Sequence, residues 1–311
     1  MVCPMLSAKC GGGDSMSGSS GGYTRPEFLV ETDWLADHLD DPNLRIFDCT
    51  THLVPNSDGT LRAESALADY WTGHISGAGY LDLQAELSDP GGAFRFTTPS
   101  AEDFAAAVGA RGIGEDSRVV LYSTGAVSWA TRVWWMLYAF GFENAAILNG
   151  GWRKWRAEAR AVSTDDDCSY PPGRFNAQAR PGLIVDSGAV LAALDDGNAV
   201  VVNALARDQH DGTSERDYGR PGGITGSVCL PALDLLNPDD GRFLDASGLR
   251  EKFSQNGIGM EQKVLAYCGG GVAATVDTFA LTLLGHNNAG IYDNSLSEWA
   301  NNHELPMRAG G

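Results

Sequence analysis

One cysteine of this sequence lies where the backbone could make its sulfur reactive. Cys268 follows the β-rich run 263–267 and precedes three consecutive glycines, after which an apolar helical pattern begins at Ala273. Glycines let the backbone curl so that successive N–H groups point inward, and the start of a helix adds partial positive charge. Such a loop stabilises a thiolate, the nucleophilic form of cysteine. It would also hold a persulfide, whose outer sulfur is anionic.

Three other interpretations of this loop are open. A lone cysteine is commonly a small buried hydrophobe, although three glycines cost folding entropy without adding packing. A phosphate-binding P-loop would need a Lys-Ser/Thr pair. A cysteine phosphatase would need an arginine near the end of the loop, where this sequence has Ala273 and Ala274. We therefore favour a cysteine that works as a nucleophile.

An internal duplication shows what the first half of the chain holds at the equivalent position. Residues 119–127 (VVLYSTGAV) align with 264–272 (VLAYCGGGV) at an offset of 145. Residues 73–78 align with 222–227 at an offset of 149, and further matches follow in the same order. Ser123 thus takes the place of Cys268. We predict an active second half and an inactive first half.

Each half reads as strands that alternate with helices. In the first half we expect strands at 44–49, 118–122 and 145–148 and helices at 100–108 and 129–140. The second half repeats this order, with strands at 200–202, 263–267 and 290–292 and helices at 246–253 and 273–284. The pattern predicts an α/β fold of two domains, each a mainly parallel sheet with helices on both faces. Cys268 then lies at the carboxyl end of a strand, where such sheets bind ligands.

Composition sets the domain boundaries. Residues 1–22 are rich in glycine and serine and read as a flexible tail, and 163–182, rich in Asp, Pro and Gly, read as a linker. The two domains then span 23–162 and 183–311. Cys3 and Cys10 lie in the tail, but no second Cys or His pair follows to complete a zinc site. We expect no metal and no cofactor.

The charge of the chain restricts its partners. With 22 Lys and Arg against 40 Asp and Glu, the net charge is −18, which would repel nucleic acid. An anionic substrate would need a local basic pocket. The sequence has no apolar run long enough to span a membrane and no apolar stretch of a secretory signal near its start. Six scattered cysteines then favour the cytoplasm over a disulfide framework.

These motifs resemble the tandem-domain rhodanese family, the thiosulfate and 3-mercaptopyruvate sulfurtransferases. Their second domain has Tyr/Thr-Cys-Gly-Ser-Gly-Val-Thr-Ala or Cys-Arg-Lys-Gly-Val-Thr-Ala, then a helix, then Tyr-Asp-Gly-Ser-Trp-x-Glu-Trp. The counterparts here are 267–274 and 292–299, and the family's Gly-His-Ile-Pro-Gly-Ala appears at 73–78. The resemblance covers nearly everything except the tail. It implies that a small anionic donor passes sulfur to Cys268, which passes it as a persulfide to a thiol (a thioredoxin-like protein or a low-molecular-weight thiol) or to cyanide.

The resemblance also implies which residues contact the substrate. The loop around the sulfur consists of Gly269, Gly270, Gly271, Val272 and Ala273. In the family, arginines ahead of the second Gly-His-Ile motif bind the donor's carboxylate, for which the planar guanidinium is suited. The residues in the matching stretch are Arg216 and Arg220. The alternative for Arg216 is a surface pair with Glu215 or Asp217.

Two histidines complete the candidate site. His210 lies where the family has another arginine. His74 matches a first-domain histidine that reaches the domain interface and could assist proton transfer. For both, the alternative is a structural histidine that bonds a loop.

Departures from the family pattern bear on the donor. The strand end Val-Asp-x-Arg reads Val-Asn-Ala-Leu at 202–205, the loop serine is Gly270, and the basic loop of the thiosulfate type is absent. Without cations in the loop, a 3-mercaptopyruvate-like donor is favoured over thiosulfate. Asn203, Leu205 and Gly270 also motivate an alternative function, a non-catalytic binding or sulfur-sensing module.

Overall fold

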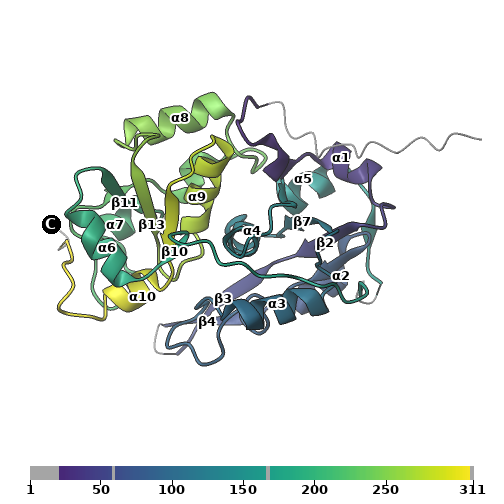
Figure 1. The fold of residues 1–311 in the computed structure, drawn as a ribbon, viewed down its shortest axis with the longest axis horizontal. Coiled ribbons are helices and arrows are strands. Elements are labelled where there is room, and N and C mark those ends of the chain that lie inside the picture. Colours follow the sequence, from purple (N-terminus) through teal and green to yellow (C-terminus); the bar gives the residue numbers. More distant parts are fainter. Residues whose placement is uncertain (1–20, 58–59, 166–168, 309–311) are drawn as a thin grey trace, which may run out of the picture.

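Two five-stranded parallel sheets form the framework of the protein, one in each half of the chain (Figure 1). The computed structural model describes residues 21–57, 60–165 and 169–308. The first sheet has the order β1-β8-β7-β2-β6, with β1 Leu29–Val30, β2 Leu44–Asp48, β6 Ala78–Tyr80, β7 Arg118–Tyr122 and β8 Ala145–Leu148. The second has the order β10-β14-β13-β11-β12, with β10 Ile184–Val185, β11 Ala199–Asn203, β12 Val228–Cys229, β13 Lys263–Tyr267 and β14 Ala289–Tyr292. The two orders correspond strand for strand, which confirms the predicted duplicated α/β fold.

Helices connect the strands and cover the sheets. Those of the first half are α1 Thr32–Asp37, α2 Leu67–Thr72, α3 Ala101–Ala110, α4 Ser128–Ala139 and α5 Gly151–Ala157. Those of the second half are α6 Ser187–Leu194, α7 Arg207–Asp211, α8 Ala246–Gln255, α9 Ala274–Leu283 and α10 Ser295–Trp299. Side-chain caps fix where α3 and α8 begin, because Ser100 Oγ accepts from the Asp103 N–H (3.1 Å) and Asp245 Oδ1 from the Gly248 N–H (2.8 Å). Among the described residues, no helix is long and apolar enough to cross a membrane.

The two halves share one apolar core. Helices α4 and α9 pack against each other between the sheets (Figure 1), and every residue of α9 is buried. Thr131 Oγ1 and Thr275 Oγ1 form a hydrogen bond of 2.7 Å across this contact. The ring of Trp134 meets Phe279 edge-on, with centroids 4.7 Å apart. Since α4 and α9 follow the strand ends with Ser123 and Cys268, this packing fixes the two strand-end loops relative to each other.

The first half has two features that the duplication did not predict. An antiparallel hairpin, β3 (Thr51–Pro55) with β4 (Leu61–Ser65), follows β2, and the second half has no such pair among its described residues. A short antiparallel pair joins β5 (His74–Ile75) to β9 (Val162–Ser163).

Of the predicted linker, 163–182, the structure describes 163–165, whose Ser163 ends β9, and 169–182, which has no helix or strand and runs along the first half (Figure 1). Its backbone bonds that half at several points, for example from the Gly173 N–H to the Gly109 carbonyl and from the Gln178 N–H to the Phe140 carbonyl, both 2.8 Å. Cys3 and Cys10, the predicted tail cysteines, lie outside the described residues.

Candidate active site

The loop between β13 and α9 carries Cys268. The carbonyl groups of this loop accept hydrogen bonds from residues of other elements. The Cys268 carbonyl accepts from the Leu296 N–H (3.1 Å), and the Gly269 carbonyl accepts from both the N–H and the hydroxyl of Ser297 (2.8 Å each). The Gly271 carbonyl accepts from Arg132 Nη1 at 3.2 Å. Two of these partners lie at the start of α10, whereas Arg132 comes from α4 of the first half.

This arrangement leaves main-chain donors free on the other side of the loop. In a trans peptide the C=O and N–H groups point in opposite directions. The N–H groups of Gly269, Gly270 and Val272 therefore point away from these partners. Within the described chain, these three groups and the N–H of Ala273 make no hydrogen bond. They form a ring of donors at the beginning of α9 that can bind an anion.

The three glycines have different reasons to be glycine. A Cβ on Gly269 would overlap the hydroxyl of Tyr218. Gly271 has φ +71°, and its Cβ would overlap the carbonyl oxygen of Asp293. At Gly270 a Cβ would have Ser297 Oγ, 3.6 Å away, as its nearest contact, so this position has room for a side chain.

Ser295 hydrogen-bonds two main-chain groups of the Cys268 loop, and its own backbone is in a strained conformation. Its Oγ accepts from the N–H groups of Cys268 (3.0 Å) and Gly271 (3.1 Å) and donates to the Tyr292 carbonyl (2.7 Å). Ser295 is fully buried and has φ +50°, unusual for a residue other than glycine. At the equivalent place the first half has Gly151, with φ +53°. The second half thus keeps a strained serine where its hydroxyl holds the loop.

In the equivalent loop of the first half, the Ser123 hydroxyl and the Thr124 N–H both have hydrogen-bond partners within that half. Ser123 Oγ donates to the Ala126 carbonyl (2.7 Å), and the Thr124 N–H donates to Thr50 Oγ1 (2.8 Å). Ser123 therefore replaces the thiol with a hydroxyl that is already bonded within the loop.

An open cleft between the halves leads to the Cys268 loop. It has a volume of about 810 Å³ and is lined by the hairpin residues Pro55, Thr60 and Leu61, by Arg95, by 214–219, and by Ser297 and Asn301. A small inner cavity of about 40 Å³ adjoins it, lined by Leu53, Leu61, Arg95, Phe96, Trp129, Tyr218, Gly270, Val272 and Ser297. Cys268 itself is only 2% exposed, and Gly270 and Val272 of its loop line this inner cavity.

The two predicted arginines lie in different surroundings. Arg216 is exposed on the wall of the cleft and makes no ion pair with any described carboxylate, so the predicted alternative of a surface pair is not seen. The structure does not bring Arg220 to the cleft. Its guanidinium donates to four carbonyls at and beyond the end of α10, at 2.7–3.1 Å, those of Trp299, Ala300, Asn302 and Leu305. This satisfies the helix end, and Arg220 has a structural place.

The two predicted histidines are both buried and line neither cavity. His210 Nδ1 lies 3.1 Å from Asn203 Nδ2, and burial lowers the pKa of His210. The imidazole is therefore neutral at neutral pH and accepts from the amide. His74 Nδ1 lies 2.9 Å from the Tyr70 carbonyl, and its ring stacks on Tyr70 with centroids 3.9 Å apart. Both contacts of His74 belong to the first half.

Sequence reasoning missed Arg95 and Tyr218, which line both cavities. The requirement for a local basic pocket predicted that an arginine would be present but could not select Arg95 from the others. Tyr218 follows Arg216 closely, and burial together with the negative charge of Cys268 raises the pKa of Tyr218 to about 12. Its hydroxyl is therefore a donor at neutral pH.

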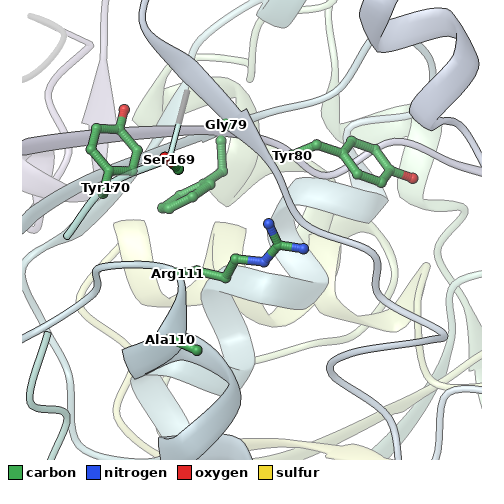
Figure 2. A pocket seen from close by; sticks show the side chains of 7 residues that line it. Gly79, Tyr80, Ala110, Arg111, Ser169 and Tyr170 are labelled. Carbon is green, nitrogen blue, oxygen red and sulfur yellow. The ribbon is translucent and has the colours of Figure 1, made fainter. Parts of the chain in front are cut away.

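A second small cavity, also about 40 Å³, lies in the first half (Figure 2). Its lining comes from β2, β6, the end of α3 and Ser169–Tyr170, with no residue of the Cys268 loop. The Arg111 guanidinium seen there is bonded to Glu86. Within residues 21–57, 60–165 and 169–308, no cluster of three or more His, Cys, Asp or Glu residues could hold a metal ion.

Comparisons with known proteins agree with this geometry. The rhodanese-like domain profile matches residues 31–158 and again residues 189–302. The 3-mercaptopyruvate sulfurtransferase of Escherichia coli strain K12 is 32% identical over 282 residues, which cover 90% of this chain and 97% of that protein. The thiosulfate sulfurtransferase of Cricetulus griseus is 32% identical over 287 residues, or 89% and 93% of the two chains. The crystal structure of the 3-mercaptopyruvate sulfotransferase SseA from Escherichia coli superposes with a TM-score of 0.76 at 30% identity, covering 87% of this chain and 99% of that one.

Proposed function

Because the chain belongs to the tandem-domain rhodanese family and is a sulfurtransferase, we propose that Cys268 is the residue that carries the transferred sulfur. The observation that supports this is the ring of free main-chain donors at the loop that follows β13. The two other described cysteines are poor candidates, because burial raises the pKa of Cys49 well above its usual value and that of Cys229 to about 11. Both therefore stay protonated at neutral pH.

The reaction consists of two displacements. With 3-mercaptopyruvate, the Cys268 thiolate attacks the donor sulfur and an S–S bond forms. The carbon–sulfur bond breaks, and its electron pair leaves as the enolate of pyruvate, which takes a proton from solvent. With thiosulfate, the S–S bond breaks and sulfite leaves with the electron pair. In the second step a thiolate or cyanide attacks the outer sulfur, and the electron pair of the S–S bond returns to Cys268 as thiolate.

The chain's own residues contribute binding and charge stabilisation. The N–H groups of Gly269, Gly270, Val272 and Ala273 hold the anionic persulfide between the two steps. Arg216 supplies positive charge on the cleft wall of a chain with a net charge of −18, and would attract an anionic donor. We keep 3-mercaptopyruvate as the favoured donor, since no loop side chain offers a cation to thiosulfate.

The acceptor and the compartment belong to the same proposal. An 810 Å³ cleft admits a low-molecular-weight thiol or an exposed cysteine loop of a thioredoxin-like protein. The described cysteines Cys49, Cys229 and Cys268 are separate buried thiols, which is typical of a reducing compartment such as the cytoplasm.

Mass spectrometry of the intact protein and of its peptides tests this assignment. After incubation with 3-mercaptopyruvate or thiosulfate, we expect a mass gain of one sulfur atom on a peptide that contains Cys268. Cys268→Ser should lose both the gain and turnover, by more than about a thousandfold, whereas Cys229→Ser should keep both. If no donor loads sulfur on Cys268, the assignment is wrong and the alternative of a non-catalytic binding module is supported.

A further inference from the structure

Arg95 is a cation from the first half at the junction of the two cavities. It lines the open cleft together with Arg216, and it lines the inner cavity together with Gly270 and Val272 of the catalytic loop. Its backbone also adjoins the loop, because a Cβ on Gly270 would lie 3.9 Å from the Arg95 carbonyl oxygen. Arg95 therefore belongs to the boundary between the cleft and the inner cavity, as do Leu61, Tyr218 and Ser297.

The guanidinium of Arg95 makes no hydrogen bond or ion pair with the described residues. Its Nε is buried without a hydrogen bond, and it makes no ion pair, although the chain has 40 Asp and Glu residues. Buried polar groups normally have partners, and an unpaired one is costly. Burial also lowers the pKa of Arg95, which reflects the loss of solvation, but arginine stays charged. A partly buried guanidinium without a hydrogen-bond or ion-pair partner is suited to bind an anion that enters from solvent.

Two neighbours complete a site for such an anion. Arg216 adds a second cation from the other half, also without an ion pair to a described carboxylate. The Tyr218 hydroxyl covers Gly269 and is protonated at neutral pH. Because the inner cavity of about 40 Å³ admits only a few atoms, a small donor can place its sulfur there while its anionic end stays beside Arg95.

We propose that Arg95 is a specificity-determining residue that binds the carboxylate of the donor at the entrance of the inner cavity. This rests on the proposed function of Cys268. The first half lacks the nucleophile, but it supplies one side of the donor site. A guanidinium can hold a carboxylate through two parallel hydrogen bonds, so the donor class is a small thiol that carries a carboxylate.

The test separates the two half-reactions. In a double displacement, kcat/KM for the donor reports the loading of Cys268 and kcat/KM for the acceptor reports its unloading. Arg95→Gln and Arg95→Lys are compared with Arg250→Gln, which removes the same charge from α8. Among the described residues, the Arg250 guanidinium hydrogen-bonds only the Ala246 carbonyl. The donor is 3-mercaptopyruvate and the acceptor is dithiothreitol, a neutral dithiol.

We expect Arg95→Gln to lower kcat/KM for 3-mercaptopyruvate by about 10- to 100-fold, the value of a charge-assisted hydrogen bond. Arg95→Lys should recover part of this loss, and kcat/KM for dithiothreitol should not change in either variant. Arg250→Gln should resemble the unmodified protein. An unchanged donor kcat/KM in Arg95→Gln overturns the inference, and so does an equal loss in both half-reactions, which would indicate a structural role. Turnover that needs Cys268 but not Arg95 contradicts this inference and leaves the proposed function intact.

Discussion

Gly270 and Gly271 are neighbours, yet the structure predicts opposite effects of alanine at these positions. At Gly271, alanine would adopt a left-handed conformation (φ +71°), which costs about 1–2 kcal/mol. Its Cβ would also overlap a main-chain oxygen of Asp293, and such overpacking costs about 1–3 kcal/mol. The smaller entropy of the unfolded chain offsets about 0.4–1 kcal/mol. Gly271→Ala should therefore lower the free energy of unfolding by about 1–5 kcal/mol.

At Gly270 neither cost applies. Its φ is outside the left-handed range, and the nearest contact of a Cβ is 3.6 Å away. Gly270→Ala should thus be neutral or stabilise the protein by about 0.4–1 kcal/mol through the unfolded state. For stability the variant is a matched control, since it adds the same methyl group to the same loop.

Gly271→Ala should also slow the chemistry, because a rotation of the Gly271–Val272 peptide that relieves the overlap moves the Val272 N–H out of the ring of donors. Loss of one such donor costs about 100- to 1000-fold in other enzymes, so we expect at least a tenfold slower loading of Cys268 in Gly271→Ala. Urea unfolding measures the loss of stability, with the transition of each domain followed separately. Rapid-quench mass spectrometry measures the rate at which Cys268 is loaded. If Gly271→Ala is as stable as Gly270→Ala and loads Cys268 as fast as the unmodified protein, the role assigned to the loop geometry is wrong.

Two further predictions concern buried charges. Arg132→Met should destabilise the protein by about 3–5 kcal/mol in thermal or urea unfolding. The reason is that it leaves Asp293, which lies 2.7 Å from the guanidinium and is only 11% exposed, without its cation. A loss below about 1 kcal/mol, the value of a surface ion pair, would contradict this. Asp277 is fully buried, its carboxylate has no hydrogen bond within the described chain, and burial raises the pKa of Asp277 well above its usual value. The folded protein therefore keeps this proton while the unfolded chain loses it near pH 3.9, so the contribution of Asp277 to stability is greatest at low pH and falls as pH rises, by up to about 1.4 kcal/mol per unit. Asp277→Asn should remove this fall, and its urea midpoint should exceed that of the unmodified protein by more at pH 8 than at pH 5; equal differences at both pH values would show that Asp277 does not titrate in this way.

The strands were predicted most accurately where the local hydrophobic pattern agrees with the position of the strand in the fold. Strands 118–122 and 263–267 match β7 and β13 to the residue, because each is a short apolar run that is buried in the middle of a parallel sheet. The duplication then placed Ser123 and Cys268 at equivalent strand ends. That inference needs only the order of elements, which a repeat preserves.

The direction of a side chain could not be predicted in the same way. Arg216 and Arg220 lie four residues apart in a stretch without helix or strand, so no periodicity relates their directions. One reaches the cleft, and the other binds the carbonyls at the end of α10. His210 and His74 likewise occupy the expected stretches but point into buried surroundings.

The residues that the first half contributes to the cleft could not be predicted from the sequence, for a different reason. The hairpin β3–β4 has no counterpart in the second half, so the repeat could not predict it. Arg95 precedes Phe96, which packs against Trp129 with ring centroids 5.6 Å apart. This contact and the packing of α4 against α9 set its place at the cleft. Such a position depends on how two domains dock, which no local pattern encodes.

Comparison of equivalent residues suggests how the two halves divided their roles. Each half holds the segment ahead of a helix in the other: Asn149 Oδ1 accepts from the Phe243 N–H (3.0 Å), and Asp293 Oδ2 accepts from the Thr98 N–H (2.8 Å). At the second of these sites the amide is replaced by a carboxylate, and Arg132 joins it as a buried ion pair. The same guanidinium reaches the Gly271 carbonyl and so orients the loop of Cys268. The first half, which has Ser123 at the position of Cys268, therefore supports the loop of the proposed nucleophile through Arg132.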